Sequence, residues 1–131
     1  MKKLDDITDL REAIATHAAA LAAGDSATAD KFVLPDTIET HRNAAAEIAR
    51  IPQPRKGETL ALAKIGFQYI SKLRFTNADA MRRVLYRWRK ESDGKWLIVS
   101  VEDTTGKRSS WSDVPNLAAA IAQARGENGN A

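Results

Sequence analysis

The sequence predicts an α+β fold in which helices pack on a strongly curved antiparallel sheet. Residues 58–104 consist of three stretches typical of β-strands, divided by two turn sequences, NADA and ESDG. The residues before this stretch carry apolar side chains at helical spacing instead. Helices that precede a run of consecutive strands are typical of α+β domains, in which the helices gather on one face of the sheet.

Composition places the chain among ordinary globular domains. It has 131 residues, 44% hydrophobic and 28% charged, with a formal net charge of +3. We expect a single domain over residues 1–126 and a disordered tail at 127–131. The absence of cysteine excludes disulfides and thiol nucleophiles. The N-terminus lacks the apolar run of a signal peptide and no stretch is long enough to span a bilayer, so we expect a cytoplasmic protein without membrane contact.

Three helices are expected first. Residues 5–23 carry an apolar stripe at helical spacing, which Gly24 can end. A shorter helix begins at Asp25 or Ser26 and stops before Pro35. A third begins after Asp36, which has a glutamate three residues on as in a capping box. Its buried side is expected to carry Ile38, Ala45, Ile48 and Ala49.

Three strands are expected next. The first is unusually long, about 58–76, with Gly66 marking a bulge or a sharp bend. The second, 81–90, alternates cleanly between an apolar face and a basic face. The third, 95–104, is apolar on both faces, which predicts a place in the middle of the sheet or beneath a partner subunit.

A loop and a helix are expected after the strands. Trp111 is the only large apolar residue of the loop and is expected to anchor it to the body. Asp113 and Pro115 begin a final helix that Gly126 closes. Its weak apolar stripe consists of Leu117, Ala118 and Ile121.

Two segments, DITDLREAIATHAAALAAGD and YRWRKESDGKWLIVSVED, give the chain a resemblance to the nuclear-transport-factor-2-like superfamily. This cystatin-like fold includes ketosteroid isomerases, polyketide cyclases and many uncharacterised small bacterial proteins. The resemblance covers roughly the first four fifths of the chain. It implies a curved sheet around the first helix, a central conical pocket and a homodimer that packs through the sheet. It implies no reaction, because one fold supports many functions, and the first helix lacks the tyrosine of the isomerase branch.

The residues that we expect to line the cone are aromatic: Phe67, Tyr69, Tyr86 and Trp88. A pocket of this kind would take a small apolar ligand, and desolvated tyrosine hydroxyls could stabilise an oxyanion. The alternative is that these side chains simply fill the core.

The candidate catalytic residues are His41, Glu102 and Asp103. A pocket histidine could act as a general base because its reference pKa lies near neutrality. Glu102 and Asp103 are adjacent on a strand, so at most one points inward, where burial would raise its pKa. The structural alternatives are a hydrogen-bonded helix histidine for His41 and, for either acid, an ion pair with Arg87, Arg89 or Lys107. His17, the other histidine, is expected at the edge of the first helix's stripe.

Other partners are weighed on the same grounds. Two histidines on separate helices lack the close spacing of a metal motif, so we expect no metal, and we expect no cofactor. Nucleic-acid binding is disfavoured because the strand aromatics lie on the face opposite the basic residues. The basic residues that could share one sheet surface are Lys64, Lys72, Arg74, Arg83, Arg87 and Arg89.

Three functions remain open at this point. The first is a small-molecule-binding domain with an apolar conical pocket. The second is an enzyme of the isomerase, dehydratase or cyclase type that uses His41 or an inward carboxylate. The third is a dimeric interaction domain that has no ligand.

Overall fold

The computed structural model describes residues 7–106 and confirms the α+β class. The expected helix at 113–126, the loop around Trp111 and the tail at 127–131 lie outside the described residues. In chain order the elements are α1 (Thr8–Ala23), α2 (Ser26–Asp30), the 3-10 helix η1 (Pro35–Thr37), α3 (Ile38–Ala49), β1 (Lys56–Ile65), β2 (Gln68–Asn77), β3 (Ala80–Lys90) and β4 (Trp96–Asp103).

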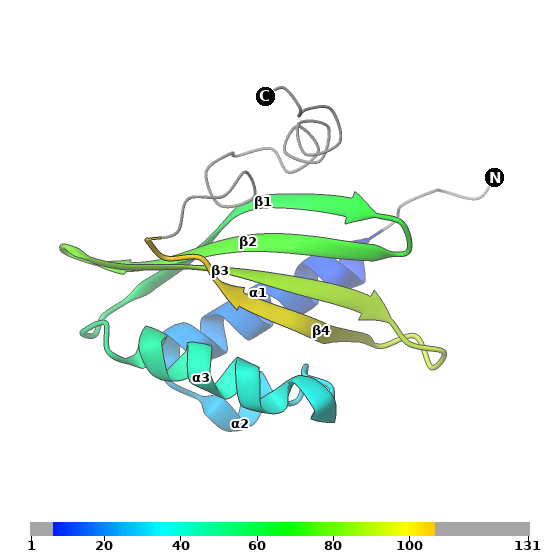
Figure 1. The fold of residues 1–131 in the computed structure, drawn as a ribbon, viewed down its shortest axis with the longest axis horizontal. Helices are drawn as coiled ribbons and strands as arrows, with labels where there is room; N and C mark the ends of the chain where they lie inside the picture. The colour runs from blue at the N-terminus through cyan, green and yellow to red at the C-terminus, as the bar shows by residue number, and fades with distance from the viewer. Residues whose placement is uncertain (1–6, 107–131) are drawn as a thin grey trace.

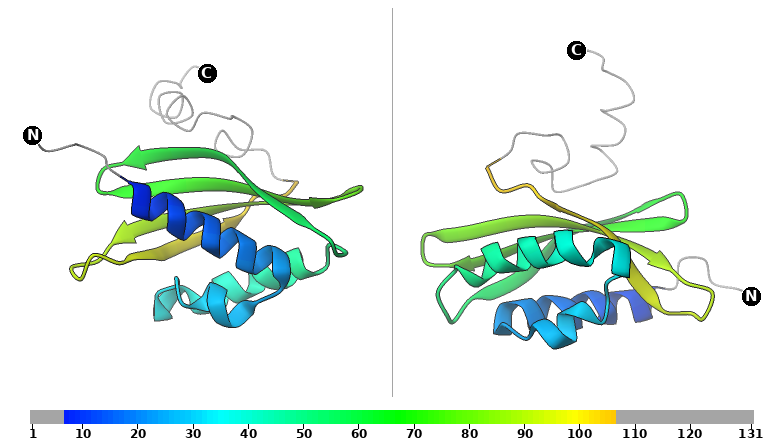
Figure 2. Two further views of the ribbon diagram at one scale, coloured as in Figure 1. Left: turned by 180° about the vertical axis from the view of Figure 1, so that it is seen from behind. Right: turned by 60° about the horizontal axis from the view of Figure 1, so that its bottom comes forward.

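The described helices all lie on one face of a curved antiparallel sheet with strand order β1-β2-β3-β4 (Figure 1 and Figure 2). α1 packs against β1 and β2, whereas α3 packs against β3 and β4. We call the helix-covered side of the sheet the inner face and the opposite side the outer face. No helix within residues 7–106 is long and apolar enough to cross a membrane.

The expected long first strand is a hairpin, so the prediction of a single strand over 58–76 is wrong. Ile65 pairs with Gln68, which leaves Gly66 and Phe67 as a two-residue loop. Gly66 has a φ of 61°, a left-handed conformation that tight hairpin loops need and that glycine adopts readily. The glycine therefore reverses the chain instead of bending a continuous strand.

β4 lies at an edge of the sheet, so the expectation of a central strand is also wrong. The edge of β4 that faces away from β3 forms backbone hydrogen bonds with the segment between α2 and η1. The backbone N–H of Ile98 donates to the carbonyl of Phe32 at 2.6 Å, and Leu34 N–H donates to the Ile98 carbonyl at 3.2 Å. This pairing satisfies backbone groups that an edge strand would otherwise leave open.

The core fills the space between the helices and the inner face. Burying each of its large apolar side chains contributes about 1.5–3 kcal/mol. Its fully buried members are Leu10 from α1, Ile48 from α3, Leu73 and Phe75 from β2, Val84 and Trp88 from β3, and Ile98 from β4.

The helix ends agree with the sequence in part. Asp25 caps α2 as expected by accepting a hydrogen bond from the backbone N–H of Thr28 at 3.2 Å. Asp36 does not cap α3, because it lies within η1. Thr37 precedes the helix and makes no capping hydrogen bond, since its hydroxyl donates to the Val99 carbonyl at 3.1 Å. Ala49 is exposed, so its assignment to the buried side of α3 is wrong.

Candidate functional site

A groove of about 420 Å³ opens among α1, α2 and α3. Its place follows from the short side chains on the facing helices, which leave a gap that larger residues would fill. The wall is therefore made largely of methyl groups. These come from Ala20 of α1, Ala29 of α2, and Ala45, Ala46 and Ala49 of α3.

The polar part of the groove consists of His41, Asp30 and Arg42, with Asp25 and Ser26 at the turn into α2. Arg42 Nη2 donates to Asp30 Oδ2 at 3.1 Å, so these two opposite charges largely cancel each other. His41 is the only member of this set that belongs to the core, with 1% of its side chain exposed.

His41 lies against His17, and the two rings join α3 to α1. Their Nε2 atoms are 2.8 Å apart, a hydrogen bond between two buried side chains. Tyr86 and Trp88 of β3 surround His17, with ring centroids 4.8 Å and 5.7 Å from its own. The histidine pair therefore lies beneath the groove, with the aromatic core on its other side.

Asp30 determines which nitrogens carry protons. A hydrogen bond between two neutral imidazoles needs one Nε2–H donor and one acceptor. Asp30 Oδ1 lies 3.7 Å from His41 Nδ1, so a proton on this Nδ1 is favoured by the carboxylate. His41 Nε2 is then the acceptor, and His17 Nε2–H donates to it. This assignment makes His41 Nδ1 a hydrogen-bond donor beside the groove.

Burial keeps both rings neutral. Desolvation, followed by the proximity of His41, lowers the pKa of His17 from 6.5 to about 3. Desolvation also lowers the pKa of His41, while Asp30 opposes this shift and Arg42 adds to it. In the same cluster the pKa of Tyr86 is raised, mainly by burial and also by Asp103. A neutral His41 retains the capacity to accept a proton.

Two buried nitrogens of the pair lack a hydrogen-bond partner among residues 7–106, namely His17 Nδ1 and His41 Nδ1. Leaving such a group unpaired costs about 1–3 kcal/mol. Of the two residues only His41 is part of the groove wall, so its Nδ1 is the candidate for contact with a molecule in the groove.

The expected aromatic lining is found elsewhere. Phe67 is 95% exposed in the β1–β2 loop, so its assignment to a pocket is wrong. Tyr69, Tyr86 and Trp88 are buried in the core cluster, and none of them lines the groove. Trp88 Nε1–H donates to Ser71 Oγ at 3.1 Å. These rings fill the cone because β2 and β3 direct them against α1 and α3.

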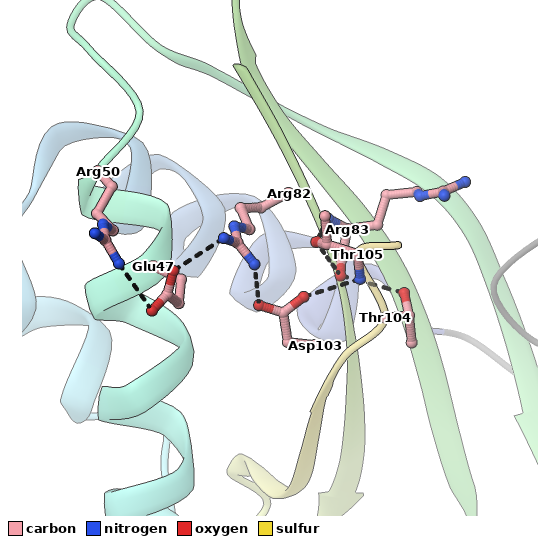
Figure 3. Close-up of polar contacts among 7 residues, drawn as sticks. All are labelled: Glu47, Arg50, Arg82, Arg83, Asp103, Thr104 and Thr105. Carbon is pink, nitrogen blue, oxygen red and sulfur yellow. Dashed lines mark hydrogen bonds and ion pairs between the residues drawn. The ribbon is translucent and has the colours of Figure 1, made fainter. Parts of the chain in front are cut away.

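The two acidic candidates lie on opposite faces of β4. Glu102 is exposed on the outer face, where it pairs in register with Leu85. Asp103 accepts from Arg82 Nη1 at 3.2 Å, and Arg82 Nη2 donates to Glu47 of α3 at 2.9 Å (Figure 3). Asp103 thus forms an ion pair as expected, but its partner is Arg82 and not Arg87 or Arg89, and Lys107 lies outside the described residues. Neither carboxylate lines the groove.

The basic residues also divide between the faces. Lys64 pairs with Tyr69, and paired residues of neighbouring strands share a face, so Lys64 belongs to the inner face. This placement follows from the reversal of the chain at Gly66. Lys72, Arg74 and the β3 arginines at alternate positions remain on the outer parity. The prediction that the six basic residues share one surface of the sheet is therefore wrong for Lys64. Within residues 7–106, no group of three or more His, Asp or Glu side chains could hold a metal ion.

The comparisons with known proteins support the fold. No family model matches the chain, and no curated protein matches it. Among solved structures, the chain is similar to a nuclear-transport-factor-2-like protein of unknown function from Shewanella baltica OS155, with a TM-score of 0.59 and 11% identity over 79% of this chain and 97% of that one. It is also similar to a designed nuclear-transport-factor-2 protein, with a TM-score of 0.56 and 17% identity over 76% of this chain and 99% of that one.

These similarities show that the chain has a nuclear-transport-factor-2-like fold. At such identities they establish the fold alone. Sequence reasoning named His41 as a candidate but missed Asp30 and the alanine wall. The available signal was the recurrence of alanine on α1, α2 and α3, since small residues on facing helices allow either close packing or a groove.

Proposed function

We propose that the protein binds a small molecule in the groove among α1, α2 and α3, with His41 as its polar anchor. The observation that carries the proposal is the buried Nδ1 of His41, which lacks a hydrogen-bond partner within residues 7–106 and borders an alanine-walled groove of about 420 Å³. Ligand sites usually combine such an apolar wall with a few convergent polar groups.

The wall and the anchor define the chemistry of the ligand. Alanine methyl groups favour a compact, mostly apolar body. The His41 Nδ1–H favours a hydrogen-bond acceptor on the ligand, such as a carbonyl oxygen. Arg42 and Asp30 pair with each other, which leaves the Asp25 carboxylate as the unbalanced charge of the groove and disfavours an anionic ligand. The ligand class is therefore a small, neutral, largely apolar carbonyl compound.

A groove-filling substitution tests this proposal. Ala46 is exposed and lines the groove, whereas Ala19 is exposed on α1 outside it. A panel of small ketones and esters is screened by protein-observed NMR, and Kd values are measured for the hits. Ala46→Leu should weaken binding about tenfold or more, a loss of about 1.4 kcal/mol. Ala19→Leu should leave Kd unchanged.

Two results would contradict the proposal. One is a set of hits whose affinity is equal in Ala46→Leu, Ala19→Leu and the unmodified protein. The other is a screen in which the perturbed amide signals lie away from α2 and α3. His41→Gln provides a second check, because removing the Nδ1–H should weaken carbonyl ligands more than hydrocarbons of the same shape.

A proton-transfer enzyme is the second candidate, and the neutral state of His41 favours it. In the other tautomer of the pair, His41 Nε2–H donates to His17 Nε2, and His41 Nδ1 can take a proton from a bound carbonyl compound, which is left as the enolate. Asp30 Oδ1, 3.7 Å from this Nδ1, would stabilise the imidazolium that forms. If ligands of the groove carry an acidic C–H, exchange of that hydrogen with deuterated solvent should be accelerated by the protein. The exchange should be lost in His41→Gln and retained in Ala19→Leu.

A further inference from the structure

The outer face of the sheet carries a second apolar cluster, separate from the main core. Its buried members are Ile70 of β2 and Leu85 of β3, with 3% and 7% of their surfaces exposed. Ala61, Ala63 and Ile65 of β1 pack against them. We call these five residues the outer cluster. Single exposed apolar residues are common, but a contiguous apolar patch indicates a surface that something covers.

No described element covers this cluster. α1, α2, η1 and α3 all lie on the inner face (Figure 2). Even so, Lys72 of β2 is only 3% exposed, although it lies on the outer face next to Ile70 and opposite Leu85 of β3. Lysine is rarely buried to this extent. α1 begins on the inner face, whereas the described chain ends beside β3, so residues 107–131 are the segment that we consider for covering the outer face.

The described chain ends beside the outer cluster. β4 pairs with β3 up to Asp103, and Thr104 N–H then donates to the Arg83 carbonyl at 2.8 Å. Arg83 N–H donates in turn to Thr105 Oγ1 at 2.8 Å (Figure 3). Gly106 follows with a φ of 76° in a turn, so the strand direction is not continued. Arg83 lies two residues from Leu85, on the same parity of β3.

An unpartnered donor lies at the same place. Arg83 Nε is buried and has no hydrogen-bond partner among residues 7–106. Its side chain points away from the ion-pair chain of Glu47, Arg82 and Asp103 (Figure 3). A buried guanidinium nitrogen needs an acceptor, and backbone carbonyls that follow Gly106 could provide one.

The remaining segment has the length and the pattern to cover the cluster. A helix over residues 113–126 would be about 20 Å long, at about 1.5 Å per residue. Four strands spaced about 4.8 Å apart are roughly 14 Å wide, so such a helix can cross the sheet. Leu117 and Ile121 are spaced four residues apart and would share one helix face.

We propose that residues 107–126 fold back over the outer face and pack Leu117 and Ile121 against the outer cluster. The chain then covers its own second apolar surface and forms a third layer on the sheet. The segment also occupies the surface through which a second copy of the chain would pack. The proposal concerns the face opposite the groove, so it stands or fails independently of ligand binding.

Thiol cross-linking in the full chain tests this proposal cleanly, because the protein has no cysteine of its own. One double variant carries Ala63→Cys on the outer face together with Ala118→Cys. The matched control carries Ala19→Cys, an exposed position on α1, together with Ala118→Cys. A short thiol-specific cross-linker is added at low protein concentration, and mass spectrometry separates cross-links within a chain from those between chains.

The expected result is a within-chain cross-link in most molecules of the Ala63 pair, several-fold above the yield of the Ala19 pair. Equal yields in the two pairs would show that the segment does not rest on the outer face. Covalent dimers formed by Ala63→Cys alone would show that a second copy occupies the surface. Either of these outcomes overturns the proposal.

A second measurement avoids cysteine substitution on the sheet. Leu117→Asp places a charge where an apolar contact is proposed, and Asn116→Asp places the same charge one residue earlier. Leu117→Asp should lower the urea midpoint of unfolding and deprotect the amides of β2 and β3 in hydrogen exchange. Asn116→Asp should do neither. Equal effects of the two substitutions would count against the docked segment.

Discussion

At the scale of single residues, the loop between β2 and β3 contains the clearest local strain. Ala78 has a φ of 54°, a left-handed conformation that costs about 1–2 kcal/mol for a residue with a side chain. Glycine adopts it without that cost, although its unfolded state has more conformational freedom. Ala78→Gly should therefore raise the free energy of unfolding by about 0.5–1 kcal/mol.

Urea denaturation checks this prediction. Asp79→Gly is the matched control, because Asp79 is exposed in the same loop without a positive φ. Asp79→Gly should destabilise slightly through backbone entropy alone. If the two glycine substitutions shifted the midpoint in the same direction, the strain at Ala78 would be refuted.

Gly57 of β1 illustrates a different constraint on a glycine. A Cβ at this position would lie 2.8 Å from Cε1 of Phe75, a side chain that is fully buried. Phe75 cannot yield without disturbing the core, so Gly57→Ala should destabilise the protein by about 1–3 kcal/mol. Phe75→Leu in the same chain should recover part of this loss, because it frees space at the contact. Additive losses in a double-mutant cycle would contradict the assigned clash.

At the scale of elements, the His17–His41 hydrogen bond joins α1 to α3 within the core. Both rings are neutral in the folded protein because burial lowers their pKa values. In the unfolded chain each imidazole takes up a proton near its ordinary pKa of 6.5. The unfolded state therefore binds more protons than the folded state as the pH falls below about 6.5, and the stability decreases.

This linkage predicts that the free energy of unfolding depends on pH in the acidic range. Between pH 6.5 and about 3, the folded pKa of His17, the free energy of unfolding should rise with pH. The slope is at most about 1.4 kcal/mol per pH unit for each histidine. His17→Gln keeps a polar atom near the Nε2 position but does not titrate, so its urea midpoint should depend less steeply on pH. An unchanged slope in His17→Gln would contradict the assignment.

The elements also show what local sequence patterns can predict. The apolar stripe of α1, the Asp25 cap and the alternation of β3 follow from neighbouring residues, and the structure has all three. The β1–β2 hairpin was misread because a glycine in an alternating stretch fits both a bulge and a two-residue loop. Only the pairing of Ile65 with Gln68 distinguishes the two, and that is a tertiary property.

At the scale of the whole molecule, the fold separates the groove from the outer cluster. The groove lies among the helices, and the outer cluster lies on the far side of the sheet. The expected conical pocket between helices and sheet is occupied by core aromatics such as Tyr86 and Trp88, both almost fully buried. The proposed ligand site therefore lies within the helical layer, and the apolar surface that we propose to be covered by residues 107–126 lies on the far side of the sheet.

The docked segment leads to a prediction about association. In the proposed arrangement residues 107–126 cover the outer cluster, so the full chain should be monomeric. A chain that ends at Gly106 should expose the cluster and form dimers or larger species as its concentration rises. Sedimentation velocity measures both, with Leu85→Lys in the shortened chain as the control that restores the monomer. A full chain that already dimerises through the outer face would contradict the prediction.

The sequence by itself determined the α+β class, the order of helices before strands and the turn sequences, because these depend on spacing and on residues close together in the chain. It also marked His41 as a candidate. Only the tertiary structure decided that His41 meets His17, from which it is 24 residues distant, that Asp30 orients the pair and that alanines leave a groove beside it. The edge pairing of β4 likewise joins segments far apart in the chain. Such contacts depend on how the helices pack against the sheet, and no local pattern encodes that geometry.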